Sequence, residues 1–238
     1  MKQLDDLSVK IFADGAELAQ MVDLYRRPYI KGFTTNPTLM RKAGIADYEG
    51  FARQVLAEIP DRPISFEVFS DEFDEMAVQA ARIRSWGDNV YVKIPVTNSR
   101  RESACDLVRR LSQDGVKVNV TALLTLDQVT AMANVLRGGA PACVSVFAGR
   151  VADTGRDPVP LMAQAVDILR QAPNAELIWA SPRELLNVFH ADAAGCHIIT
   201  ATPDILNKLS LIGKSLEDYS LETVKMFRDD AVRAGFVI

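Results

Sequence analysis

Short apolar runs rich in β-branched residues constrain the fold more than any other feature of the sequence. Eight such runs occur, at residues 9–13, 32–35, 64–69, 90–94, 118–123, 143–147, 177–180 and 196–199. They recur at intervals of roughly 20–35 residues, which is the spacing that one strand plus one helix requires. Apolar residues at i, i+3 and i+4 predict helices between them, at 71–85, 99–113, 126–136, 158–171 and 183–194. The pattern predicts an α/β fold, a single (β/α)8 TIM barrel.

The predicted barrel covers about residues 9–212 of a single domain, 1–238, and a C-terminal helical extension follows at about 215–238. An open, doubly wound sheet is the alternative fold, but no G-x-G-x-x-G motif follows the first run. The tripeptide Gly213-Lys214-Ser215 resembles the end of a phosphate-binding loop. Lys208, however, occupies the position of that motif's first glycine, which argues against such a loop.

Composition and charge exclude several classes of protein. Of the 238 residues, 48% are hydrophobic and 24% are charged, as is usual for globular chains. The net charge of -4 argues against nucleic acid or an anionic membrane as the main partner. The three cysteines do not predict a disulfide framework, and Asp5 and Asp6 interrupt any secretory signal. No uncharged run approaches the ~18 residues of a membrane span, so a cytoplasmic location is expected.

Polar side chains gather near the ends of the predicted strands. Asn119 and Thr121 alternate with valines, so both point into the barrel. The same alternation pairs Thr34 with Asn36, Ser65 with Glu67, and Ser145 with Phe147, while Asp14 closes the first run. Barrels of this type place catalytic groups at the C-terminal ends of their strands. For each residue alone, a hydrogen-bonded core position or a helix cap is the alternative interpretation.

Lys93 is the most informative of these residues. It is the only charged residue in the run 90–96, and burial there opposes its protonation. A neutral, desolvated amine attacks carbonyl groups and forms a Schiff base, which provides an electron sink without a metal. The alternative is a lysine that extends toward solvent or forms an ion pair with Glu67.

The remaining polar residues match the needs of a Schiff-base enzyme acting on a sugar. Two carboxylates on different strands, Glu67 and Asp14, are free to take different acid and base roles. Sugar hydroxyls suit the neutral groups Asn36, Asn119 and Ser145. At the rim, Arg150, Ser181 and Arg183 form a candidate phosphate site, with ordinary surface ion pairing as the alternative for the arginines.

Metal catalysis and a histidine-dependent triad have little support in the sequence. His190 and His197 lie seven residues apart, and no cluster of cysteines or histidines with ligand spacing accompanies them. Both histidines are expected to be structural.

Five stretches resemble the transaldolase family of class I, Schiff-base enzymes, and especially its short subfamily that includes fructose-6-phosphate aldolase. They are residues 12–14, 32–38, 92–97, 119–121 and 145–150, within a similarity that runs from about residue 11 to 206. The most specific parts are Thr-Thr-Asn-Pro at 34–37 and Lys-Ile-Pro-Val-Thr at 93–97.

This resemblance implies a role for each matching position. Lys93 would be the Schiff-base lysine, Asp14 would move the proton of the substrate hydroxyl, and Glu67 and Thr121 would hold a catalytic water. The substrate-binding residues would be Thr35, Asn36, Asn119, Ser145 and Phe147, with Arg150, Ser181 and Arg183 binding phosphate. No metal or organic cofactor is implied.

Two positions discriminate between the activities of this family. Transaldolases have glutamate and phenylalanine at the positions of Glu67 and Phe147, whereas fructose-6-phosphate aldolases carry glutamine and tyrosine. The resemblance therefore favours transfer of a dihydroxyacetone unit from fructose 6-phosphate or sedoheptulose 7-phosphate to erythrose 4-phosphate or glyceraldehyde 3-phosphate. The alternatives are an aldolase, an enzyme for a sulfonated sugar, because Pro182 replaces a common aromatic residue, and a non-catalytic sugar-phosphate-binding barrel.

The resemblance also carries expectations about context. It places the chain in carbohydrate metabolism, in the pentose phosphate pathway. It implies a homo-oligomer, with a pentamer or decamer as candidates, in which the apolar C-terminal stretch docks onto a neighbouring subunit. Sugar phosphates are the only other expected partners.

Overall fold

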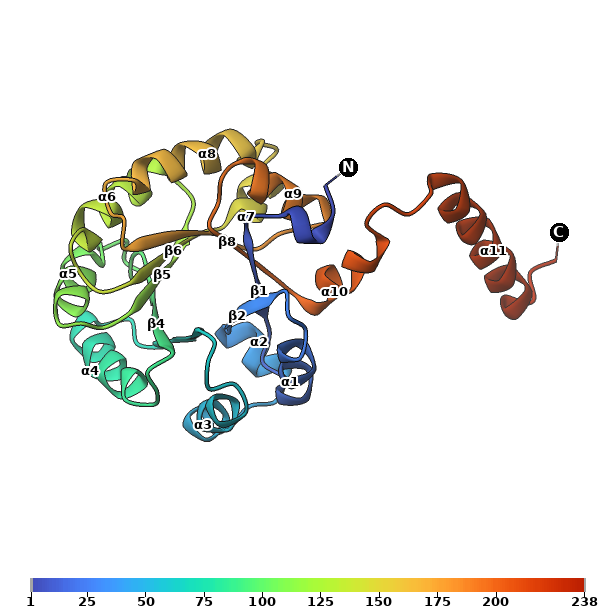
Figure 1. Ribbon diagram of the computed structural model, residues 1–238. Helices are drawn as coiled ribbons and strands as arrows, with labels where there is room; N and C mark the ends of the chain where they lie inside the picture. The colour runs from blue at the N-terminus through green and yellow to red at the C-terminus, as the bar shows by residue number, and fades with distance from the viewer. Residues whose placement is uncertain (1, 238) are drawn as a thin grey trace.

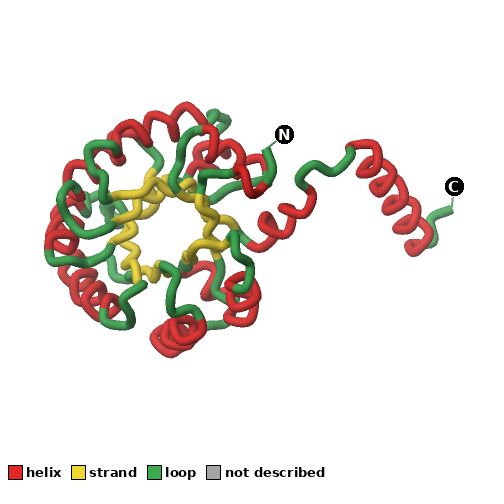
Figure 2. Tube along the Cα trace, in the orientation of Figure 1, coloured by secondary structure: helices red, strands yellow, loops and turns green. Residues whose placement is uncertain are grey.

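The computed structural model describes residues 2–237 and contains a closed barrel of parallel strands (Figures 1 and 2). The strands are β1 (Lys10–Asp14), β2 (Ile30–Thr34), β3 (Ile64–Glu67), β4 (Val90–Pro95), β5 (Val118–Leu123), β6 (Ala142–Val146), β7 (Ala175–Trp179) and β8 (Ile198–Ala201). Each pairs with the next in parallel, and β8 closes the barrel against β1. The predicted TIM-barrel fold is confirmed.

Helices surround the barrel on its outer face, except for the last helix, which extends away from it (Figure 2). They are α1 (Leu18–Tyr25), α2 (Pro37–Lys42), α3 (Tyr48–Glu58), α4 (Phe73–Arg84), α5 (Cys105–Gln113), α6 (Leu126–Leu136), α7 (Ala148–Asp153), α8 (Pro158–Leu169), α9 (Leu186–Ala193), α10 (Pro203–Leu206) and α11 (Leu216–Ala234), with short 3₁₀ helices at Leu4–Asp6 and Asn207–Leu211. Helices separate the strands because parallel neighbours cannot be joined by a tight hairpin and need a crossover connection.

The two faces of each strand explain its composition. One parity, which includes Phe33, Phe66 and Ile94, is fully buried beneath the helices. The other parity faces the barrel interior, where Phe12, Cys143, Ile178 and other apolar side chains fill the lower part. The polar residues Asp14, Thr34, Glu67 and Lys93 share that second parity but lie nearer the C-terminal ends of their strands. The interior thus has an apolar layer beneath the polar residues of its C-terminal end, and the Lys10–Glu176 ion pair lies at the opposite end.

The start of α5 differs from the prediction. The helix expected from residue 99 begins only at Cys105. Arg101 adopts a left-handed φ of 66°, which a helix cannot contain, and Thr97 bridges to Ser103. The prediction extended the helix into residues 99–104, but this segment is a structured loop.

Helix α11 extends away from the barrel (Figure 1). Ser215 caps its start by accepting a hydrogen bond from the Asp218 amide, and the Lys214 ammonium pairs with Glu222. The Gly213-Lys214-Ser215 sequence therefore begins a helix, as capping chemistry explains without a phosphate. Within residues 2–237, no helix is both long and apolar enough to cross a bilayer.

Candidate active site

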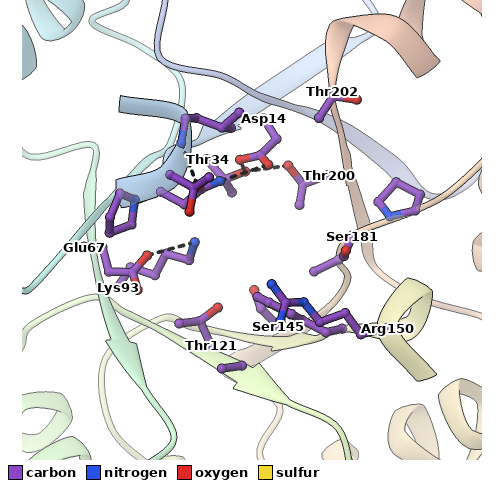
Figure 3. A pocket seen from close by; sticks show the side chains of 18 of the residues that line it. Asp14, Thr34, Glu67, Lys93, Thr121, Ser145, Arg150, Ser181, Thr200 and Thr202 are labelled. Atoms are coloured by element: carbon purple, nitrogen blue, oxygen red, sulfur yellow. Dashed lines mark hydrogen bonds and ion pairs between the residues drawn. The ribbon is translucent and has the colours of Figure 1, made fainter. Parts of the chain in front are cut away.

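A cavity of about 570 Å³ opens at the C-terminal ends of the strands (Figure 3). Ten of the twelve residues expected at the site line this cavity. The ten are Asp14, Asn36, Glu67, Lys93, Thr121, Ser145, Phe147, Arg150, Ser181 and Arg183. Thr35 and Asn119 are the two that do not line it. Residues that lie up to 169 positions apart in the sequence are brought together because all eight strands point the same way.

Lys93 and Glu67 form the centre of the cavity wall. They are direct neighbours in the register of β3 and β4, and Lys93 Nζ lies 3.2 Å from Glu67 Oε2. The amine also donates a 3.0 Å hydrogen bond to the carbonyl oxygen of Thr35. Lys93 is only 6% exposed, so its side chain does not extend into bulk solvent. The ion pair with Glu67, which was the alternative interpretation of Lys93, is present, and Lys93 also lines the cavity.

Thr121 lines the cavity at an irregularity in β5. The pairing of β5 with β6 shifts register between Val120 and Leu123, and Ala122 has a left-handed φ of 64°. Within the described part of the chain, Oγ1 of Thr121 is buried and has no hydrogen-bond partner. A buried hydroxyl of this kind requires a partner, and a water or a substrate in the cavity would supply one.

Asp14 lies across the cavity from these residues and is held by two neighbours. Thr34 Oγ1 donates to one carboxylate oxygen at 2.8 Å, and Asn36 Nδ2 donates to the other at 3.3 Å. Asn36 also caps α2, because its Oδ1 accepts from the Leu39 amide at 3.0 Å, and Pro37 occupies the first helical position. The Asn-Pro pair thus starts a helix and orients a carboxylate at once.

Burial raises the pKa of Asp14 above its ordinary value. The positive charge of Lys93 and the hydrogen bonds from Thr34 and Asn36 oppose this shift only in part. A raised pKa suits a carboxylate that must exchange a proton with a substrate hydroxyl.

Asn119 and Thr35 lie behind the cavity wall and contact residues that line it. Asn119 is fully buried, donates to Ser65 Oγ at 2.9 Å and accepts from Ser145 Oγ at 2.7 Å. Its amide therefore holds Ser145, which does line the cavity. The Thr35 hydroxyl donates to the carbonyl oxygen of Ser65 at 2.8 Å, so only its own carbonyl faces the site, through Lys93.

Two arginines lie at the rim of the cavity. Arg150 belongs to α7, directly after β6, and its guanidinium lies 5.3 Å from the centre of the Phe147 ring. Arg183 follows Ser181, which adopts a left-handed φ of 60°. Strained residues of this kind concentrate at functional sites. The arrangement brings two cationic groups and a hydroxyl to one edge of the cavity, as expected for an anion site.

Asp153, a residue that the sequence reading did not single out, holds Arg183 from outside the cavity. Arg183 Nε donates to Asp153 Oδ1 at 3.0 Å, and Nη2 donates to the second oxygen of the same carboxylate. The Arg183 guanidinium lowers the pKa of Asp153. Because this contact uses one edge of the guanidinium, Nη1 keeps both of its N–H groups for an anion.

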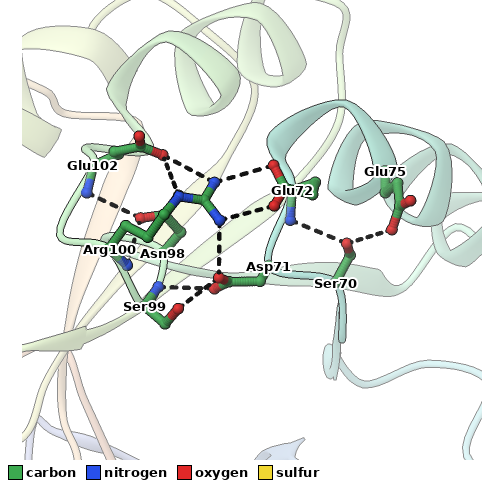
Figure 4. Close-up of polar contacts among 8 residues, drawn as sticks. All are labelled: Ser70, Asp71, Glu72, Glu75, Asn98, Ser99, Arg100 and Glu102. Atoms are coloured by element: carbon green, nitrogen blue, oxygen red, sulfur yellow. Dashed lines mark hydrogen bonds and ion pairs between the residues drawn. The ribbon is translucent and has the colours of Figure 1, made fainter.

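A second ion-pair network ties together the loops that follow β3 and β4 (Figure 4). Arg100 contacts Glu72 at 2.8 Å, Glu102 at 3.1 Å and Asp71 at 3.4 Å, while Ser99 Oγ donates to Asp71 at 2.6 Å. The pKa of Asp71 is lowered, chiefly by its hydrogen bonds from Ser99. These contacts join the ends of the two strands that carry Glu67 and Lys93.

Thr34, Thr200 and Thr202 also line the cavity, although none was included among the expected site residues. Thr34 was recognised only as an inward-facing residue. The predicted eighth run ended at residue 199, one position before Thr200. The usable signal was its parity with Ile198, which places the Thr200 side chain inside the barrel.

The two histidines lie outside the cavity lining. His197 Nδ1 accepts a hydrogen bond from the Leu177 amide at 3.0 Å, and burial lowers the pKa of this imidazole. His190 packs against Trp179. Between residues 2 and 237, no group of three or more His, Cys, Asp or Glu side chains could hold a metal ion.

Comparison with solved structures supports the architecture. A mandelate oxidase variant superposes with a TM-score of 0.57 over 85% of this chain and 71% of that protein. The two sequences are only 11% identical, so this likeness concerns the barrel fold alone.

Curated relatives match nearly the whole chain. A probable transaldolase of Dehalococcoides mccartyi is 33% identical over 202 residues, which is 84% of this chain and 90% of the relative. That of Streptococcus agalactiae is 34% identical over 216 residues, 90% of this chain and 95% of the relative. A third, from Thermoanaerobacter, is 32% identical over 231 residues, 97% of this chain and 100% of the relative.

The family model described as transaldolase/fructose-6-phosphate aldolase matches residues 11–237. This span includes the whole barrel except Lys10, together with the cavity and α11. The chain belongs to the transaldolase/fructose-6-phosphate aldolase family of enzymes.

Proposed function

We propose that this chain is a transaldolase that moves a dihydroxyacetone unit from a ketose phosphate to an aldose phosphate. Fructose 6-phosphate and sedoheptulose 7-phosphate are the proposed donors, and erythrose 4-phosphate and glyceraldehyde 3-phosphate the acceptors. The observation that carries the proposal is the Lys93 amine, 3.2 Å from Glu67 Oε2 in a cavity that also holds Asp14. Family membership, with relatives named probable transaldolase, supports it.

The first step is attack of Lys93 Nζ on the C2 carbonyl of the ketose. A carbon–nitrogen bond forms, and the carbonyl oxygen becomes a hydroxyl that must leave as water. Glu67 lies beside the amine, and Thr121 offers an unpaired hydroxyl to the same cavity. A water held by these two groups relays the proton that the leaving oxygen needs. Loss of that oxygen as water gives the iminium ion on Lys93.

The second step breaks the bond between C3 and C4 of the ketose. Asp14 accepts the proton of the C4 hydroxyl, the C3–C4 electron pair moves to the iminium nitrogen, and the aldose departs. The three-carbon unit stays on Lys93 as an enamine until an acceptor aldehyde reverses these events. Its hydroxyls are proposed to bind Asn36 and Ser145, and Asn119 orients Ser145 through their 2.7 Å hydrogen bond.

Phe147 favours transfer over release of free dihydroxyacetone. Its ring lines the cavity beneath Arg150, where a phenol would offer a proton to the enamine. Phenylalanine has no such proton, so the enamine persists until an aldehyde arrives. An aldolase activity is therefore the minor proposal.

The substrate's charged end is proposed to bind at the rim. Arg150, Arg183 and the Ser181 hydroxyl lie on one edge of the cavity, which suits a phosphate oxyanion. A sulfonated sugar is the alternative anion. Comparing fructose 6-phosphate with its sulfonated analogue as donors separates the two, since the preferred anion gives the larger kcat/KM.

The experiment that tests the function is reductive trapping. Incubation with fructose 6-phosphate and borohydride is expected to add one reduced three-carbon unit, located on the Lys93 peptide by mass spectrometry. Lys93→Met is expected to abolish the adduct, whereas Lys42→Met, at an exposed lysine, is expected to keep it. A full adduct on Lys93→Met would refute the nucleophile. Substrate binding with no adduct at any pH would indicate a non-catalytic sugar-phosphate-binding barrel.

The cellular setting follows from this activity as a further proposal. The donors and acceptors named above place the enzyme in carbohydrate metabolism, in the pentose phosphate pathway. Cys105, Cys143 and Cys196 are all free, which suits the reducing cytoplasm. The chemistry uses no metal or organic cofactor, since Lys93 supplies the electron sink.

Helix α11 supports a homo-oligomer. It contains no buried residue, and Leu216, Val224, Phe227 and Val232 are each at least 60% exposed. A helix with such an apolar surface is stable when it packs against a partner. We propose that the partner is a second copy of this chain, in a ring such as a pentamer or a decamer.

A further inference from the structure

Asp14, Thr34 and Thr200 form a continuous chain of hydrogen bonds at one side of the cavity (Figure 3). Thr34 Oγ1 lies 2.8 Å from Asp14 Oδ1 and 2.6 Å from Thr200 Oγ1. The three residues come from β1, β2 and β8, which are neighbours in the closed barrel. Thr34 is 2% exposed and Thr200 is 6% exposed, yet both line the cavity.

The number of available hydrogens fixes the direction of this chain while Asp14 is ionised. A carboxylate only accepts hydrogen bonds, so the single hydroxyl hydrogen of Thr34 is committed to Asp14. Thr34 then has no hydrogen left for Thr200, and Thr200 must donate to Thr34. In this state the Thr200 oxygen presents only lone pairs to the cavity.

Proton uptake by Asp14 allows the chain to reverse. The substrate hydroxyl loses its O–H bond, and the carboxyl group gains one. Asp14 then donates to Thr34, Thr34 donates to Thr200, and the hydrogen of Thr200 turns toward the cavity. The electron pair of the broken O–H bond forms the carbonyl of the departing aldose, while the C3–C4 pair moves to the iminium nitrogen. The two threonine hydroxyls only rotate, so none of their covalent bonds forms or breaks.

We propose that Thr200 is a positioning residue for carbon–carbon bond cleavage, acting on Asp14 through Thr34. This inference rests on the proposed function of the site. While Asp14 awaits a proton, donation from Thr200 strengthens the hydrogen bond that Thr34 gives to the carboxylate. After proton transfer, the reversed chain supplies a donor that stabilises the developing product oxygen within the cavity.

Other charges around Asp14 do not substitute for this contact. Lys93 on β4 is the positive charge that acts on Asp14, and Asn36 donates to its second oxygen from the start of α2. Glu67 on β3 is paired with Lys93. The rim arginines Arg150 and Arg183 share the cavity, but neither supplies a hydrogen bond to the Asp14 oxygen that Thr34 contacts.

Thr200→Val tests the proposal because valine keeps the shape of threonine and removes the hydroxyl. With fructose 6-phosphate and erythrose 4-phosphate, kcat is expected to fall about tenfold while KM stays within about twofold. The acidic limb of the kcat profile is expected to move to higher pH, since Asp14 loses support for its ionised form. Thr200→Ser is expected to restore both rate and profile.

Two controls separate this role from a structural one. Thr130→Val makes the same change on the exposed surface of α6 and is expected to leave kcat and the pH profile unchanged. Borohydride trapping of dihydroxyacetone requires Lys93 but no carbon–carbon cleavage, so Thr200→Val is expected to trap it as wild type does.

The outcomes distinguish this inference from the proposed function. A Thr200→Val profile that superimposes on wild type would overturn the inference. So would loss of trapping in parallel with turnover, or failure of Thr200→Ser to rescue. Absence of trapping in the wild-type protein would instead overturn the proposed function.

Discussion

Two asparagines at this site each have a structural role and a role in positioning another side chain. Asn36 caps α2 and holds Asp14, and Asn119 fills the barrel interior and holds Ser145. The sequence identifies such a residue as polar and inward-facing, but it does not show which groups the side chain contacts. It assigned Asn119 and Thr35 to substrate contact, and whether they take part in binding stays a prediction. The structure places both behind the cavity wall, because their hydrogen bonds point to other protein groups.

Residue parity explains what could be predicted at this scale. Inward-facing polar residues can be recognised from alternation within a strand, which identified Glu67 and Thr121, whereas Lys93 was identified as the only charge in an apolar run. Asp153 escaped because it contacts the site only through Arg183, a neighbour 30 positions away in the sequence. No local pattern encodes such a partner.

Asp14→Asn is expected to trade activity for stability. Because the pKa of Asp14 is raised in the folded protein, its stabilising contribution is present below the unfolded pKa, near 3.8, and is lost as the pH rises through the folded value. At pH 7 the ionised carboxylate therefore destabilises the fold. The amide variant should have a higher Tm at pH 7, and kcat should fall roughly 10²–10⁴-fold.

Measuring Tm from pH 3 to 8 checks this assignment. The advantage of Asp14→Asn over wild type should disappear toward pH 3, where Asp14 is neutral in both states. A variant that is less stable than wild type at pH 7 would contradict the burial of a charged carboxylate at this position.

Helix α7 determines where the two rim arginines lie. Its first turn packs directly on the loop after β7, where a Cβ at Gly149 would overlap the carbonyl oxygen of Ser181. Arg150 and Asp153 lie on this one helix, and Asp153 reaches Arg183 on the opposing loop. The close approach of two backbones thus sets the geometry of the proposed anion site.

Gly149→Ala is expected to disturb that approach. The added methyl group must push α7 and the Ser181 loop apart, which costs about 1–3 kcal/mol in the free energy of unfolding. KM for fructose 6-phosphate should rise more than tenfold, because both arginines shift. Gly155→Ala changes a glycine with open space around it but a left-handed φ of 78°, so it should cost stability without raising KM. An unchanged KM in Gly149→Ala would contradict this view of the rim.

Strand and helix positions were predictable where local chemistry agreed with the pattern. The helix predicted at 126–136 coincides with α6, where Thr125 and Gln128 form a capping box with hydrogen bonds of 3.3 Å and 3.1 Å. The loop before α5 was not predictable, because its Arg100 network is built from residues of two loops. Tertiary contacts override apolar spacing there.

The whole molecule combines a closed barrel with a helix that the barrel does not cover. The barrel has no free strand edges, so its own architecture offers no site for strand pairing with another chain. Helix α11 is the opposite case, since its apolar side chains remain exposed. The sequence predicted both features, because eight strand–helix repeats leave one amphipathic segment without a strand.

Truncation after Ser215 is expected to break the proposed homo-oligomer. Loss of the exposed apolar surface of α11 should reduce the mass measured by light scattering to that of a smaller assembly or a monomer. A second variant, Phe227→Glu, keeps the full chain and should have the same effect, since it adds a charge to a side chain that is 63% exposed. Assemblies of unchanged mass in both variants would refute docking through α11.

The central claim, dihydroxyacetone transfer on Lys93, is tested most directly by following a labelled donor. Fructose 6-phosphate labelled in its first three carbons is incubated with the enzyme, with and without erythrose 4-phosphate, and samples are reduced with borohydride. The account predicts label on the Lys93 peptide, which the acceptor discharges into sedoheptulose 7-phosphate. Label in that product with none on Lys93 at any time, or label released only as free dihydroxyacetone, would contradict it.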